Sequence, residues 1–120
     1  MITIEYGGVA RTAYIANNLL RKALGETPNL SWDSISGSQR DGYTKAVIAL
    51  MNNPSTTAEQ QHQKWYDART SEGWVYGPVK DSVLKTHPNL VSYNSLPKEQ
   101  HIKDEMFRSV VLSIAGVPGA

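Results

Sequence analysis

Aromatic and basic side chains gather in one short stretch of this 120-residue chain. Stacking on an aromatic face and charge-assisted hydrogen bonds from cations are what a flat heterocycle joined to phosphate requires. The stretch therefore predicts a pocket for a nucleotide-like ligand. The competing interpretation makes the tryptophans core anchors and leaves the lysines solvated, as is common in small domains. The residues concerned are Trp65, Tyr66, Trp74 and Tyr76, with Lys64, Arg69, Lys80 and Lys85 interleaved.

One helical face carries part of this group. His62, Trp65, Tyr66 and Arg69 are spaced at i, i+3, i+4 and i+7, so a helix would place them side by side. His62 has two possible roles on that face. It can hydrogen-bond a phosphate or ribose, or it can be a half-buried histidine that a backbone carbonyl of the adjoining loop satisfies. The spacing does not decide between them.

Other chemistries find little support. The chain has no cysteine, and its three histidines at 62, 87 and 101 are widely spaced, so we expect neither a metal site nor a cofactor. No serine stands in a G-x-S-x-G elbow, and Gly73 and Gly77 do not form a known phosphate loop. These motifs therefore give no support to an enzyme and do not exclude one.

Four helices must position these residues. Apolar spacing predicts the first over Ala10–Leu24, with Gly25 as its stop, and a second from Ser34 or Ser36 to about Asn52. Thr57 followed by Gln60 has the form of a capping box, which predicts a third helix over Ala58–Ser71. A last helix follows Pro97, with an apolar stripe through Ile102, Met106, Val110 and Ile114 that Phe107 and Val111 widen.

The segment between the third and last helices predicts short extended pieces. Trp74–Tyr76 and Leu90–Tyr93 are expected to pair as a two-stranded ribbon. Alternation along the first piece would put Trp74 and Tyr76 on one face and Val75 against the core. The predicted fold is mainly α with a small β element (α+β), in a single domain over residues 1–120 with about four helices.

Charge and hydropathy limit the partners. The formal net charge is +1 and no basic stripe appears, so we expect no binding to a DNA or RNA duplex. The longest apolar stretch, residues 110–117, is too short to span a bilayer, and the first residues lack the basic start of a signal peptide. These features favour a cytoplasmic protein without membrane contact.

An ordered series of motifs resembles the ryanodine-receptor repeat (RyR) domain. The series consists of His62…Trp65, Gly73-Trp74-Val75-Tyr76-Gly77, Lys80-Asp81, His87-Pro88-Asn89-Leu90-Val91 and Tyr93…Leu96-Pro97. Further motifs resemble the version found in small phage and prophage proteins, and they extend the likeness to about residues 9–115. They are Ala23-Leu24-Gly25, Trp32-Asp33, Asn53-Pro54 and Lys103-Asp104…Phe107-Arg108.

The resemblance implies an RyR-repeat-like fold and a non-catalytic module that sequesters a nucleotide-derived signal, of cyclic-nucleotide or ADP-ribose type, in phage counter-defence. A protein-interaction module without a small ligand is the alternative, and a hydrolase of the same nucleotide is a third. We also expect a homo-oligomer, with residues 114–117 as a candidate contact. The candidate ligand-binding residues are Trp74, Tyr76, Lys80, His62, Arg69, Tyr93, Lys103 and Arg108.

Overall fold

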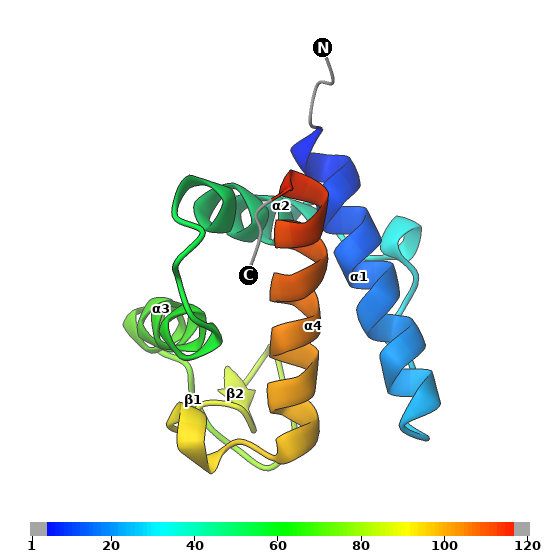
Figure 1. Ribbon diagram of the computed structural model, residues 1–120. Coiled ribbons are helices and arrows are strands. Elements are labelled where there is room, and N and C mark those ends of the chain that lie inside the picture. Colours follow the sequence, from blue (N-terminus) through cyan, green and yellow to red (C-terminus); the bar gives the residue numbers. More distant parts are fainter. Residues whose placement is uncertain (1–4, 117–120) are drawn as a thin grey trace. The chain divides into compact units, whose positions relative to one another are not determined.

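The computed structural model describes residues 5–116, which form helices and a minimal sheet (Figure 1). This confirms the predicted fold, mainly α with a small β element. None of the described helices is both long enough and apolar enough to cross a membrane. In chain order the elements are α1 (Tyr6–Ala23), the 3-10 helix η1 (Trp32–Ser34), α2 (Gly37–Asn52), α3 (Ala58–Ser71), β1 (Val75–Tyr76), β2 (Thr86–His87), the 3-10 helix η2 (Tyr93–Ser95) and α4 (Lys98–Ala115).

The described chain divides into two compact units. Unit 1 holds the described residues up to Thr56 and those from Ile102 onward, and unit 2 holds Thr57–His101. The first turn of α4 therefore belongs to unit 2, whereas its later turns belong to unit 1. Each unit is described separately below.

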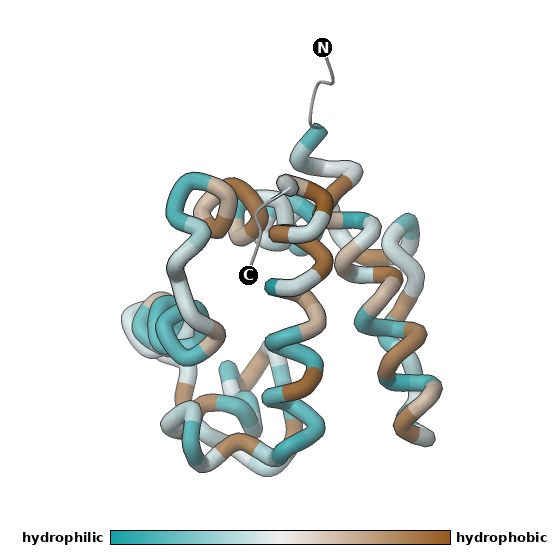
Figure 2. Tube along the Cα trace, viewed as in Figure 1, coloured by the Kyte–Doolittle hydropathy of each residue, from teal (hydrophilic) through white to brown (hydrophobic). Residues whose placement is uncertain are grey.

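Unit 1 is built on an aliphatic core. Its buried side chains come from α1, α2 and the later turns of α4, which carry most of the strongly hydrophobic segments in Figure 2. Burial of aliphatic surface of this kind is the main favourable term in folding. The core residues are Val9, Ala10, Ala13, Val47, Leu50, Val111 and Leu112, with Trp32, Met51, Phe107 and Val110 packed against them.

The buried face of α4 is centred on Val111, at the widened edge of the predicted stripe, and not on its central row. Val111 and Leu112 are fully buried, whereas Ile102 and Ile114 are 38% and 44% exposed. The reason is that α4 packs through its later turns around Val111, so the ends of the predicted stripe lie beside the contact. The expected oligomer contact comprises residues 114–117. Ile114 is partly exposed, and Val117 lies outside the described residues.

Local signals set the helix ends as predicted. Thr57 and Gln60 form both hydrogen bonds of a capping box at the start of α3, and Ser36 and Gln39 do the same for α2. Gly73 follows α3 with a φ of 90°, a left-handed conformation that glycine adopts at little cost. α1 begins at Tyr6, four residues before the predicted start.

The predicted strand pairing is wrong. β1 pairs with β2 in parallel, with Val75 opposite Thr86 and Tyr76 opposite His87. Residues 90–93 are not a strand, because the buried Leu90 follows a turn at residues 88–89 and Tyr93 begins η2. The expected burial of Val75 is also wrong, since this side chain is 57% exposed.

A close backbone approach explains the observed register. A Cβ atom on Gly77 would lie 2.6 Å from Cβ of Thr86, so only glycine lets the two strands come this near. Lys85 has a left-handed φ of 55°, which turns the chain into β2. The geometry therefore depends on a close approach at Gly77 and on a left-handed Lys85, neither of which strand propensity reveals.

Candidate ligand-binding site

Trp74 is held against the end of α3. Gly73 turns the chain back, and the Trp74 backbone N–H donates to the carbonyl of Arg69 at 3.0 Å. The Arg69 guanidinium consequently lies over the indole, 5.7 Å from its centroid. This is a cation–π contact, and it places a positive charge beside a half-buried aromatic ring. Glu72 also pairs with Arg69 at 3.1 Å, at the protein surface.

His87 adds a neutral donor to the same neighbourhood. Its Nδ1 accepts the Asn89 backbone N–H at 3.0 Å, which leaves the ring proton on Nε2. Burial, together with the positive charges of Lys80 and Arg69, lowers the pKa of His87 to about 4. The imidazole is therefore uncharged at neutral pH, and both cations lie near enough for their fields to reach it.

The loop between β1 and β2 gives Lys80 a defined position. Asp81 and Thr86 exchange two backbone hydrogen bonds of 3.0 Å, and one Asp81 carboxylate oxygen accepts the N–H groups of Val83 and Leu84. Lys85 ties this loop to the end of α3 by donating to the Glu72 carbonyl at 2.8 Å. The exposed Lys80 thus projects from an ordered turn.

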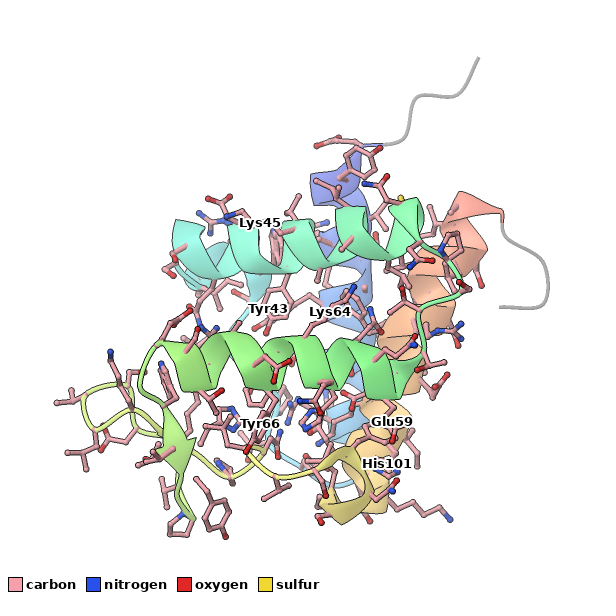
Figure 3. All side chains as sticks on the ribbon, turned by 90° about the vertical axis from the view of Figure 1, so that its left-hand side faces the viewer. Tyr43, Lys45, Glu59, Lys64, Tyr66 and His101 are labelled. Atoms are coloured by element: carbon pink, nitrogen blue, oxygen red, sulfur yellow. The ribbon has the colours of Figure 1, made fainter. Side chains whose placement is uncertain are left out.

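A second set of rings belongs to unit 2 and includes His62, Tyr93 and His101. His62 bonds through Nε2 to the Val91 carbonyl at 2.8 Å, so the backbone-carbonyl interpretation of this histidine is confirmed. Tyr93 stacks on His101 with ring centroids 4.2 Å apart and planes 7° from parallel. Figure 3 labels Tyr66 on α3 and His101 at the start of α4. These rings anchor η2 to the helices of unit 2.

Trp65 joins the two sets. Its ring lies 5.5 Å from that of His62 and 5.0 Å from that of His87, the latter in an edge-to-face arrangement. Among the predicted residues, unit 2 thus brings Arg69, Trp74 and Lys80 to one neighbourhood around His87. It places His62 and Tyr93 in the supporting ring cluster.

Tyr76 has a different setting. It stands in β1 and is 59% exposed. The side chain is therefore available to a ligand or to a partner.

Lys103 and Arg108 belong to unit 1, where both have partners. Lys103 is 7% exposed, and its Nζ donates to the Glu26 carboxylate at 2.6 Å. This hydrogen bond holds the pKa of Glu26 below its usual range. Arg108 donates to the backbone carbonyls of Thr56 and Pro54 at 2.8 and 3.4 Å. These cations stabilise the unit 1 framework.

Sequence reasoning missed His87 as a member of the site. A histidine in a two-residue strand gives no local sign that it will be neutral, because its state depends on burial and on the charges of Lys80 and Arg69. The only local signal is Asn89, whose N–H two residues on can fix the ring. Within residues 5–116 no three histidine or carboxylate side chains gather as metal ligands would.

Residues 47–116 match the family model of the RyR domain. The match covers more than half of the 120-residue chain and runs from the middle of α2 to the end of α4. The protein therefore belongs to the RyR-domain family. The matched range contains every residue of the unit 2 site.

Proposed function

We propose that this RyR-domain protein is a binding protein that sequesters a nucleotide-derived small molecule, of the cyclic-nucleotide or ADP-ribose type. The observation that carries the proposal is the convergence of Trp74, Arg69, Lys80 and His87 in unit 2. An indole supplies a stacking surface for a base, and two cations with an Nε2–H donor supply charge-assisted and neutral hydrogen bonds for phosphate oxygens.

The chemistry of His87 favours binding over turnover. A general base works best when its pKa lies near the operating pH. The pKa of His87 is lowered to about 4, so its imidazole is a weak base at neutral pH. The neighbouring groups are an aromatic ring, two cations and the Glu72 carboxylate, which is paired with Arg69 at 3.1 Å. We therefore propose a non-catalytic role.

The proposal extends to the biological setting and the assembly. The motifs shared with small phage and prophage proteins support a role in phage counter-defence, in which the protein removes a nucleotide messenger from the host cytoplasm. We also propose a homo-oligomer, because a small sequestering domain buries more of its ligand when a neighbouring copy completes the pocket. Light scattering that returned a 13.3 kDa particle with and without ligand would contradict the oligomer.

A thermal-shift panel tests the proposed function. The protein is screened against cyclic nucleotides, ADP-ribose, its cyclic forms and ATP, and a true ligand at 100 times its dissociation constant stabilises the fold by about 2.7 kcal/mol. Mass spectrometry of the ligand after denaturation of the complex should recover it intact. Accumulation of a hydrolysis product would overturn the non-catalytic role.

A matched pair of variants locates the binding site. Lys80→Gln should weaken binding about tenfold or more, because it removes a charge-assisted bond. Lys98→Gln, which neutralises an exposed lysine elsewhere in unit 2, should bind like the wild type. Absence of any stabilising compound, or equal affinity of the two variants, would contradict the proposed site.

A second candidate function rests on the loop between the strands. Val79, Val83 and Leu84 are 70%, 91% and 70% exposed, and their neighbour Tyr76 is also exposed. Apolar side chains that cluster in this way are typical of protein-interaction surfaces. In that case Leu84→Asp should abolish capture of a purified partner, and no compound of the nucleotide panel should stabilise the wild-type protein.

A further inference from the structure

α1 and α3 end in the same way. In each helix the backbone carbonyl of an arginine in the last turn accepts the N–H of the residue five positions later, at 2.9 Å in unit 1 and 3.0 Å in unit 2. The residue before that donor is a left-handed glycine, with a φ of 79° in unit 1 and 90° in unit 2. The arginine side chain also contacts the residue after the glycine, through a salt bridge in unit 1 and over an indole ring in unit 2. The residues are Arg21, Gly25 and Glu26 in unit 1 and Arg69, Gly73 and Trp74 in unit 2.

η1 and η2 repeat one short motif. The serine before each 3-10 helix hydrogen-bonds through its hydroxyl to the hydroxyl of a serine three residues later, at 2.9 Å in both units. The backbone of the first serine has a φ of −62° and a ψ of 156° in unit 1, and −60° and 153° in unit 2. A buried aliphatic residue follows the second serine, and the next helix begins two residues further on. The motif consists of Ser31, Ser34 and Ile35 in unit 1 and of Ser92, Ser95 and Leu96 in unit 2.

The side chains that hold this motif also correspond. A ring residue of the preceding helix, seven positions before the arginine, donates to the carbonyl of the residue just before the first serine. The fourth residue of the following helix donates to the carbonyl of the aromatic residue after that serine, at 3.3 Å in unit 1 and 2.6 Å in unit 2. Sequence order, spacing and bonding thus agree between the units. The donor–acceptor pairs are Tyr14–Leu30 and Arg40–Trp32 in unit 1 and His62–Val91 and His101–Tyr93 in unit 2.

The two units differ in the chain between the helix end and the 3-10 motif. The hydrogen bond from the helix to the residue before the first serine spans 16 residues in unit 1 and 29 in unit 2, so unit 2 is longer by 13 residues. Trp74 and Val91 bound the longer version. It contains β1, β2 and the loop between them, and with them Lys80 and His87 of the proposed ligand site.

The longer segment contributes no side chain to the apolar core. Among residues 75–89, all of which the structure describes, Gly77 alone is buried. The buried Leu90 follows the segment. Both ends are tied to α3, since the Trp74 N–H bonds to one turn of this helix and the Val91 carbonyl to another. Matching positions of α1 hold the ends of the shorter segment, so a connection of the shorter length should span the same gap.

We infer that the helical parts of the two units are two copies of one module, and that residues 75–89 are an insert in the second copy that recognises the ligand and is not needed for the fold. The first copy comprises α1, η1 and α2, and the second comprises α3, η2 and the start of α4. At the place of the insert the first copy has Thr27 and Pro28. The recognition part of this inference rests on the proposed function, whereas the duplication does not.

The first copy has no counterpart of the stacking surface. Glu26 occupies the position that Trp74 has in the second copy, and its carboxylate is engaged by Arg21 at 3.4 Å and by Lys103 at 2.6 Å. An acidic side chain held by two cations does not stack on a base, and its charge repels phosphate. The family match, residues 47–116, also leaves out α1 and η1. The first copy therefore acts as framework, and ligand recognition belongs to the second.

Two loop replacements of equal length test the duplication. In the aligned variant, Thr-Pro, the dipeptide of residues 27–28, replaces residues 75–89. This variant should keep the helix content and the cooperative unfolding of the wild type, because its ends fall on equivalent points of α3. In the shifted variant, the same dipeptide replaces residues 77–91. Its urea midpoint should lie about 1 M or more below that of the aligned variant, because it also loses the buried Leu90 and the Val91 carbonyl.

Titration calorimetry on the same proteins tests the recognition part. The tightest-binding compound of the nucleotide panel should bind the aligned variant at least tenfold more weakly than the wild type, because Lys80 and His87 are gone. Wild-type affinity in the folded aligned variant would overturn the assignment of recognition to the insert.

The duplication and the proposed function fail in different ways. Loss of cooperative unfolding in the aligned variant, or a urea midpoint no higher than that of the shifted variant, would overturn the duplication. Absence of binding by the wild type would overturn the proposed function and the recognition part together. The urea comparison would still decide the duplication in that case, because it needs no ligand.

Discussion

The two units are stabilised by different means. Unit 1 buries aliphatic side chains from three helices, whereas α3 of unit 2 is almost entirely hydrophilic (Figure 2). The buried apolar residues of unit 2 are Ala58, Leu90 and Leu96, and most of its remaining contacts are ring pairs and hydrogen bonds to the backbone. Unit 1 thus relies on nondirectional burial and unit 2 on directional contacts.

The aliphatic core of unit 1 and the directional contacts of unit 2 respond differently to substitution. An aliphatic core tolerates changes of surrounding charge but not the loss of volume. Directional contacts between rings, imidazoles and carbonyls respond to protonation and to single atoms. A ligand site composed of the same groups can therefore sit among the contacts of unit 2 while unit 1 supplies stability.

The largest expected effect comes from deleting volume in unit 1. Leu112 is fully buried, so Leu112→Ala should lower the free energy of unfolding by about 2–5 kcal/mol. Leu84 of unit 2 is 70% exposed, and Leu84→Ala should change it by less than about 0.5 kcal/mol. Urea denaturation followed by circular dichroism measures both. Equal losses would show that the two units do not differ in this way.

Two glycine substitutions sharpen the comparison. Gly77→Ala would force Cβ to within 2.6 Å of Thr86 Cβ and should destabilise the protein by about 1–3 kcal/mol. Gly42 lies inside α2 with nothing within 4 Å of an added Cβ, so Gly42→Ala should stabilise it by about 0.5–1 kcal/mol. Thermal unfolding of both variants checks the opposite signs. A neutral Gly77→Ala would contradict the close approach of the strands.

These features also show what sequence can predict. The capping boxes and the glycine after α3 are local, so the ends of α2 and α3 follow from a few neighbouring residues. The strand register does not, because it depends on the approach of Gly77 to Thr86 and on the left-handed Lys85.

The candidate site residues also divide into those that local sequence predicts and those that depend on distant contacts. Arg69 and Trp74 are close in sequence, and their residue types alone predict an aromatic surface beside a cation. Lys103 is different, since its partner Glu26 lies 77 residues away. No local pattern reveals that this lysine is buried in an ion pair.

A smaller effect is expected from the titration of His87. Its pKa is about 4 in the folded protein, against about 6.5 in an unfolded chain, so the unfolded state takes up a proton that the folded state excludes. Stability contributed by the neutral ring is therefore full above pH 7, falls as the pH drops through 6.5, and levels off below 4.

Comparison with His87→Gln isolates this contribution. Because the ring is partly accessible and solvent screens its neighbours, we expect the wild type to lose on the order of 1 kcal/mol more than His87→Gln between pH 7 and pH 4. Urea unfolding at several pH values measures the difference. Parallel pH profiles for the two proteins would contradict a neutral, partly buried His87.

Trp74→Ala tests most directly whether unit 2 carries a ligand site that is separable from the fold. Titration calorimetry with the tightest-binding compound of the nucleotide panel should show an affinity about 10–100 times weaker than that of the wild type, because one stacking surface contributes about 1–3 kcal/mol. The urea midpoint should stay close to that of the exposed-site control Val83→Ala. Unchanged affinity, or unfolding of the variant while the surviving protein binds normally, would contradict the account and make Trp74 a structural anchor.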